Sequence, residues 1–256
     1  MFRNMVEKEQ TNRPEDYFEQ DGIRQYGEKV GVFEQADLES IKITTESLIH
    51  IARHLVSLSR EAQSRLIGQD FLDGSEHRTI DDDFLASQLA TAGSKFNPTI
   101  NNPEKIVSFC LEKIKTILAT GQIPFWIKDP ITGNMSVDFR VVVTPEDKDN
   151  FGIPVAEKLG TASLVKITPE IADRVSEEWR GAGQAVDRIK VNVVSGVEVP
   201  MTDNLIITVK KRPDRPPVLY TAFTGIATAL PPRPSEQSAE ALEYNKKWWS
   251  DYAFIK

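Results

Sequence analysis

The spacing of apolar residues changes once along the chain, and this change limits the fold to helices first and strands second. Between Leu38 and Leu118 apolar side chains recur every three or four residues, as in a helix with one buried face. From Ile123 onward they alternate with polar residues, for example over Val137–Val143, as in a half-buried strand. We therefore predict an α+β protein with N-terminal helices packed on a C-terminal, mostly antiparallel β-sheet.

Local signals place the helix ends. We predict a helix from Leu38 to Val56, a break at Ser57–Ser59, and a short helix that ends at Gly68, since serine favours an N-cap and glycine a C-terminal end. Asn102-Pro103-Glu104 starts a longer helix, with asparagine as the cap. Further helices are predicted from Thr79 as cap to Gly93, from Thr168 to Trp179, and over residues 239–249.

Turn residues separate the predicted strands of the second half. These strands cover residues 123–128, 135–143, 161–167, 186–194, 204–211 and 218–223. In the last of them, simple alternation places Leu219, Thr221 and Phe223 on one face and their neighbours on the other. Thr221 would then lie among apolar residues and require a hydrogen-bond partner.

The charge is unevenly distributed. Residues 1–40 contain ten acidic and five basic side chains, so they carry −5 of the total −7. No Pro-, Gly- or Ser-rich linker divides the rest, and we interpret 1–40 as an acidic lead segment and 41–256 as one α+β domain. A negative protein is repelled by phosphate, which opposes nucleic-acid binding, but the body after residue 40 is nearly neutral.

No signal peptide or membrane span is expected. The start, MFRNMVEKEQ, is charged and lacks an apolar core, and the apolar runs are far shorter than the roughly 18 residues of a span. We expect a soluble protein that depends on a dedicated secretion apparatus if it leaves its cell. The single cysteine, Cys110, falls on the apolar face of a predicted helix, which favours a small core residue over a nucleophile.

Histidine chemistry can involve only His50, His54 and His77. His50 and His54 are four residues apart, so they share a helix face and could hold a metal, although no glutamate-rich frame supplies a third ligand. His54 lies near the predicted C-terminal end of its helix, where the helix dipole stabilises imidazolium and favours general acid–base catalysis. The alternative is a half-buried capping histidine.

Arg65 follows His54 by eleven residues. On one straight helix they would be roughly 16 Å apart, but a break at Ser57–Ser59 could fold the second helix back. Arg65 could then bind a phosphate through two parallel hydrogen bonds; otherwise it is a solvated surface arginine. A basic patch precedes the last strand and is either a solvated turn or a polyanion site, with Lys210, Lys211 and Arg212 as its core and Arg215 beside it.

Three stretches resemble the RNase A-like toxin domain at the C-terminal ends of bacterial contact-dependent inhibition and polymorphic toxins. They are Arg53-His54-Leu55-Val56 with Arg65-Leu66, Thr79-Ile80-Asp81-Asp82-Asp83 before Ala86, and Tyr220-Thr221-Ala222-Phe223. The motifs are short and span residues 48–225. The resemblance implies a barnase–EndoU–colicin–RelE-like fold, cofactor- and metal-independent RNA cleavage with tRNA as one candidate substrate, action in a target-cell cytoplasm, and a cognate immunity protein as partner.

The resemblance also implies roles for residues. His54 would move the proton of the 2′-hydroxyl or the leaving group, Arg65 would stabilise the phosphorane charge, and Thr221 would position the phosphate. Phe223 and the basic residues Lys210, Lys211 and Arg212 would contact the RNA. All of this requires His54, Arg65 and Thr221 to meet in one cleft.

Two departures from that family leave other functions open. Phe223 stands where the family commonly has tyrosine, so the contact of that hydroxyl is either absent or supplied elsewhere, with Tyr252 and Thr224 as candidates. Residues 151–184 resemble an insertion relative to that family. One alternative is a catalytically inactive binding or effector module that docks through the acidic lead or the Pro231–Pro234 loop. Another is a metal-dependent hydrolase that uses His50 and His54.

Overall fold

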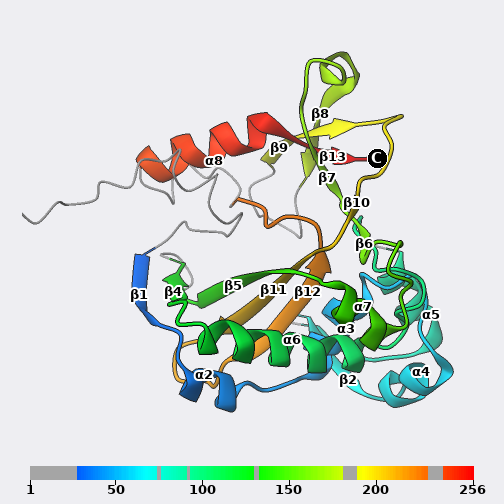
Figure 1. Ribbon diagram of the computed structural model, residues 1–256, viewed down its shortest axis with the longest axis vertical. Coiled ribbons are helices and arrows are strands. Elements are labelled where there is room, and N and C mark those ends of the chain that lie inside the picture. The colour runs from blue at the N-terminus through cyan, green and yellow to red at the C-terminus, as the bar shows by residue number, and fades with distance from the viewer. Residues whose placement is uncertain (1–27, 74–75, 91–92, 130–132, 181–188, 230–238) are drawn as a thin grey trace, which may run out of the picture.

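A five-stranded antiparallel sheet runs through the middle of the protein (Figure 1). The computed structural model describes residues 28–73, 76–90, 93–129, 133–180, 189–229 and 239–256. The strand order is β1-β4-β5-β11-β12, and each neighbouring pair is antiparallel. The strands are β1 (Glu28–Val32), β4 (Phe125–Lys128), β5 (Met135–Val142), β11 (Asn204–Lys211) and β12 (Val218–Thr224). The predicted α+β class is confirmed.

The N-terminal helices gather on one side of this sheet (Figure 1). They are α2 (Gln35–Ser40), α3 (Thr45–Ala52), α4 (Arg60–Leu66), α5 (Asp82–Leu89) and α6 (Pro103–Ala119). The main core lies between helices and sheet, where Ile49 and Ile106 from the helices and Ile207 and Leu219 from the strands are fully buried. Burial of such side chains contributes about 1.5–3 kcal/mol each, so this interface stabilises the packing of α3 against β12.

Two predicted caps are confirmed and two helix starts differ. The side chains of Ser59 and Asn102 cap α4 and α6 as predicted. The helix predicted from residue 38 is two helices, because Thr44 begins α3 with a capping box. Asp81 caps α5 in place of Thr79, which is paired with Asp70 in an unpredicted hairpin, β2 (Asp70–Asp73) and β3 (Glu76–Thr79).

A second, smaller sheet lies on the other side of the first (Figure 1). Its order is β7 (Leu164–Lys166), β13 (Tyr252–Ile255), β9 (Ile189–Val194) and β8 (Val175–Arg180), and α8 (Ala239–Asp251) packs against β9 and β13. This unit has its own apolar cluster, formed by Leu164, Val191, Ala229, Trp248 and Trp249.

The helix predicted from Thr168 to Trp179 is wrong. A single 3-10 turn, η1 (Ala172–Arg174), follows the Thr168-Pro169 signal, and β8 then pairs with β9 along its whole length. Glu177 in β8 and Lys190 in β9 form a cross-strand ion pair of 3.0 Å. Pairing with the next strand, β9, has overridden a local helix-start signal here.

Part of the acidic lead segment belongs to the fold. Residues 28–40 supply β1 and α2, the Phe33 side chain is fully buried, and Asp37 accepts a hydrogen bond of 3.1 Å from the Trp126 indole. Residues 1–27 and the Pro231–Pro234 loop lie outside the described residues. In the described part of the chain, no helix is long and apolar enough to cross a membrane. Cys110 is fully buried, and burial raises the pKa of its thiol.

Candidate functional site

A cavity of about 270 Å³ lies where the C-terminal end of α3 meets the edge strand β12. Its walls come from the helical half of the chain and from a late strand. From the sequence, side chains from these two parts are expected to come together. The lining residues are His50, Arg53, His54, Gly93, Ser94, Ser163, Tyr220, Thr221 and Phe223. Three of the predicted site residues, His54, Thr221 and Phe223, are among them.

A β-bulge brings two consecutive residues of β12 to the cavity. In the register with β11, Thr221 lies opposite Thr208 and Leu219 lies opposite Val209, so Tyr220 is the extra residue of the bulge. Such an extra residue bends the strand and shifts the alternation of its side chains. Leu219 is therefore fully buried in the core, whereas Tyr220 and Thr221 both line the cavity. The predicted shared face is therefore wrong for Leu219, whereas Thr221 and Phe223 both line the cavity.

The backbone places His54 directly after the last turn of α3. Its N–H donates to the carbonyl of Ile51 at 3.0 Å, and its own carbonyl accepts from the N–H of Phe96 at 2.7 Å. The imidazole Nδ1 lies 3.2 Å from the Ser94 carbonyl oxygen and 2.9 Å from the Ser94 hydroxyl. Because a carbonyl oxygen can only accept, the first contact places a proton on Nδ1 and leaves Nε2 with its lone pair.

The pKa of His54 is lowered from 6.5 to about 4, mostly by burial, and the hydrogen bond to the Ser94 carbonyl only partly opposes this. The nearby charges of Lys95, His50 and Arg53 contribute to the same lowering. The expected stabilisation of imidazolium by the helix end does not hold here, because desolvation outweighs a dipole effect of at most about 2 kcal/mol. The His54 ring is therefore neutral at neutral pH and can accept a proton at Nε2.

The guanidinium in the cavity belongs to Arg53. Its Nε donates to the Gln88 side-chain oxygen on α5, and its Nη1 lies 3.2 Å from His50 Nδ1. Arginine only donates, so His50 Nδ1 must be the acceptor. The His50 ring packs on Tyr220 with centroids 4.5 Å apart, and the Lys210 ammonium lies 3.3 Å from the centre of the Tyr220 ring.

Arg65 lies outside the cavity. Its guanidinium pairs with Glu61 at 2.6 Å and with Glu104 of α6, and its side chain is 53% exposed. The predicted break before α4 exists, but α4 presents Arg65 to α6 and not to His54. The structure thus brings two of the three expected groups together and supplies Arg53 as the arginine. The available sequence signal was that Arg53 adjoins His54 in one of the stretches that resemble the toxin family.

The basic residues of the predicted patch do not form one surface in the structure. Lys210 contacts Tyr220 of the cavity wall. Lys211 pairs with Asp37 at 3.4 Å, and Arg212 is exposed in the turn that follows β11. Consecutive strand residues point to opposite faces, so a run of basic residues on a strand cannot form one surface.

Neither candidate for the missing tyrosine hydroxyl lines the cavity. The Thr224 hydroxyl donates to the Thr161 carbonyl at 2.6 Å, and Tyr252 stacks on Trp248 in the second apolar cluster. The phenol that does line the cavity is Tyr220, which the bulge places beside Thr221.

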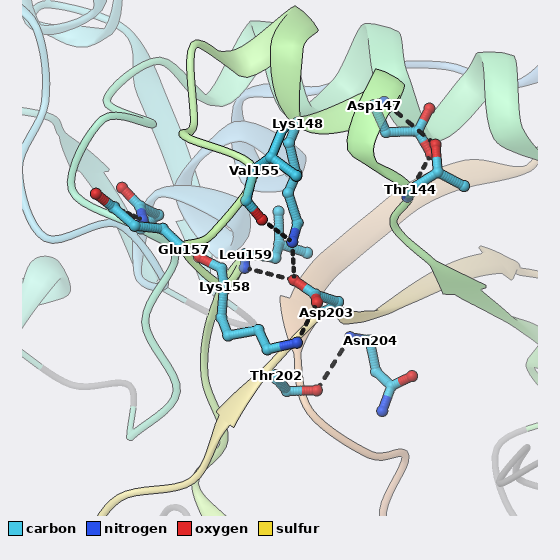
Figure 2. A network of polar contacts seen from close by, with 11 residues as sticks. Thr144, Asp147, Lys148, Val155, Glu157, Lys158, Leu159, Thr202, Asp203 and Asn204 are labelled. Carbon is cyan, nitrogen blue, oxygen red and sulfur yellow. Dashed lines mark hydrogen bonds and ion pairs between the residues drawn. The ribbon is translucent and has the colours of Figure 1, made fainter.

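A polar network centred on Asp203 joins separate segments of the chain (Figure 2). Asp203, just before β11, accepts from the Leu159 N–H at 3.0 Å and pairs with Lys148 at 3.0 Å and Lys158 at 2.7 Å. Burial raises the pKa of Asp203, but hydrogen bonds from Lys158 and Lys148 outweigh it, and the pKa lies below its usual value. Lys148 belongs to α7 (Pro145–Phe151). The network fixes the chain immediately before β6 (Gly160–Thr161), which pairs with β10 (Met201–Thr202).

His50 and His54 do not belong to a larger group of possible metal ligands in the part of the chain that the structure describes. Among the residues that the structure describes, no group of three or more His, Cys, Asp or Glu side chains could hold a metal ion. The Nδ1 atoms of His50 and His54 are directed to Arg53 and Ser94 respectively.

The comparisons with known proteins identify no family. No protein-family model matches the chain, and no curated protein matches it. A crystal structure of a conserved hypothetical protein from Toxoplasma gondii aligns with 63% of this chain and 88% of its own, at 10% sequence identity and a TM-score of 0.35. A similarity at that level carries no argument about fold or function.

Proposed function

We propose that the protein is a metal-independent ribonuclease toxin that cleaves RNA by attack of a ribose 2′-hydroxyl on the adjacent phosphate. The observation that carries this proposal is the shared cavity of His54 from the end of α3 and Thr221 from β12, with Arg53 beside them. Cleavage of this kind needs a base, a cation for the phosphorane and an acid for the leaving 5′-oxygen. The cavity offers side chains of each type.

His54 is the proposed general base. Its Nε2 carries a lone pair because Nδ1 bonds the Ser94 carbonyl, and its low pKa keeps the ring neutral before reaction. In this scheme Nε2 takes the proton as the 2′-oxygen forms a bond to phosphorus. Phe223, whose ring stacks on the imidazole with centroids 5.5 Å apart, fixes the plane of the base.

Arg53 and Thr221 are proposed to bind the phosphate. Gln88 and His50 hold the Arg53 guanidinium in place, so little side-chain entropy remains to be lost when an anion binds. The Thr221 hydroxyl lines the same cavity and can donate a hydrogen bond to a non-bridging oxygen. A preorganised cation and donor of this kind stabilise developing charge far better than mobile water does.

Tyr220 is the proposed general acid, because its phenol lines the cavity and can give its proton to the departing 5′-oxygen. The His50 ring packs on Tyr220 and its Nδ1 accepts from Arg53, so His50 holds these two side chains in place and does not supply the proton. Expression toxicity and neutralisation by an immunity protein would follow from the activity, in line with the resemblance of the sequence to toxin domains.

The direct test uses a short fluorescent RNA with the full-length protein, in buffer containing a chelator. We expect cleavage that leaves a 2′,3′-cyclic phosphate, and no cleavage when the ribose at the scissile position is 2′-deoxy. His54→Gln should reduce the rate at least about 100-fold, the usual contribution of a general base. Intact RNA after prolonged incubation with folded wild-type protein would reject the ribonuclease proposal.

A matched pair of arginine variants tests the assignment of the phosphate ligand. Arg53→Ala should lower the single-turnover rate by about two orders of magnitude, whereas Arg65→Ala should retain it within about twofold, since Arg65 pairs with Glu61 and Glu104 outside the cavity. The opposite result would assign the role to Arg65, as the family resemblance implies. If neither protein nor variants cleave RNA, the catalytically inactive binding module becomes the better description.

A further inference from the structure

The Lys95 ammonium donates hydrogen bonds to backbone carbonyls on both sides of His54. It donates to the carbonyl oxygens of Arg53 at 2.7 Å and Leu55 at 3.3 Å, the residues on either side of His54. The carbonyl between them, that of His54, accepts from the N–H of Phe96. Three consecutive carbonyls are thus held by two consecutive residues, 95 and 96.

The same ammonium also bonds the Leu89 carbonyl at the end of α5. Carbonyls at helix ends have no partner within the helix and carry the negative end of the helix dipole, so a cation there satisfies them. Lys95 therefore joins the ends of α3 and α5 at one point. Burial lowers the pKa of its ammonium.

The position of Lys95 is itself fixed from the sheet side. Its backbone N–H donates to the Thr161 hydroxyl at 2.9 Å, and its carbonyl accepts from the Thr161 N–H at 2.7 Å. Gly160 packs closely against the backbone of Lys95, because a Cβ on Gly160 would lie 2.2 Å from the Lys95 carbonyl oxygen. Lys95 is thus held between the ends of α3 and α5 on one side and strand β6 on the other.

We propose that Lys95 is the positioning residue of His54: it fixes the turn that carries the imidazole into the cavity and keeps a positive charge behind the ring. The groups that face His54 are Arg53, His50 and Tyr220 in the cavity and Lys95 behind it, and none of them is a carboxylate. The positive charge of Lys95 therefore adds to the effect of burial in keeping the imidazole neutral. The inference rests on the proposed function only in treating His54 as a base.

The test measures the pKa of the His54 imidazole and not RNA cleavage, so its result decides this proposal even if the ribonuclease proposal fails. Histidine Cε1–H signals of the full-length protein are titrated by NMR, with His54→Gln for assignment and His77 as an internal reference. Lys95→Met removes both charge and donor, Lys95→Gln removes the charge but keeps a donor, and Lys95→Arg keeps both. We expect the His54 pKa to rise by about one unit in the Met and Gln variants and to stay near the wild-type value in the Arg variant.

The matched control is Lys148→Met. Lys148 is a buried lysine that bonds Val155 and Asp203, which do not line the cavity. This variant should lower stability without moving the His54 pKa. An unchanged His54 pKa in folded Lys95→Met would overturn the proposal, and so would an equal shift in Lys148→Met. If Lys95→Met does not fold, the comparison of the Gln and Arg variants decides in the same way.

Discussion

The imidazole of His54 lies stacked on the ring of Phe223, with centroids 5.5 Å apart and planes inclined by 28°. One ring comes from the turn after α3 and the other from the edge strand β12, about 170 residues later in the sequence. The contact joins the two halves of the fold at the candidate site. It also places an apolar ring where the resembling toxin family commonly has tyrosine.

Replacement of Phe223 separates stacking from hydroxyl chemistry. Phe223→Tyr keeps the ring on His54 and adds a donor at the cavity, so we expect RNA cleavage to rise several-fold. Phe223→Leu loses the ring contact, worth about 0.5–1.5 kcal/mol, and should lower the rate about two- to tenfold. Single-turnover rates measure both effects. Equal rates in all three proteins would show that this ring does not orient the base.

Burial of His54 makes stability depend on pH. Below pH 6.5 the unfolded chain takes up a proton on this imidazole that the folded protein, with a pKa of about 4, does not. The free energy of unfolding should therefore fall between pH 6.5 and 4, by at most about 3 kcal/mol from this residue. Urea unfolding of wild type and His54→Gln across this range isolates the effect, because other groups are common to both. Parallel stability curves would contradict a lowered His54 pKa.

Asp203 should be the most sensitive carboxylate of the polar network in Figure 2. Asp203→Asn leaves the buried Lys148 ammonium without its counter-charge, and loss of one partner of a buried pair costs about 3 kcal/mol. The urea midpoint should fall while the m-value is unchanged. Asp149→Asn changes an exposed carboxylate of α7, the helix that carries Lys148, and serves as the control. A midpoint drop of similar size in both variants would contradict a special role for Asp203.

Gly160 should tolerate no side chain. A Cβ there would overlap the Lys95 carbonyl oxygen, so Gly160→Ala must displace the segment that holds His54, at a cost of about 2 kcal/mol. We expect a melting temperature lower by roughly 6 °C. Gly31→Ala, where the added atom meets open space, should change it far less. Comparable melting temperatures for the two variants would show that the backbone at Gly160 can move freely.

Local sequence signals were sufficient wherever a segment's own residues decide its structure. The strand predicted at residues 204–211 has those bounds in β11, and the Asn102-Pro103 signal begins α6. The end of α3 near His54 and the break before α4 were also predicted, since caps and glycines act within one turn. The same signals failed at β8, where pairing with β9 outweighs them.

The sequence by itself determined the α+β class, the bounds of β11 and the start of α6, which follow from side-chain periodicity and capping residues within short segments. It also singled out His54 and Thr221 as candidates, whose proposed roles come from the resemblance to the toxin family. Only the tertiary structure decided which arginine reaches the cavity, since Arg53 and Arg65 differ in the elements packed around them and not in chemistry. The bulge at Tyr220 and the hold of Lys95 on the His54 turn likewise depend on contacts between distant segments, which no local pattern encodes.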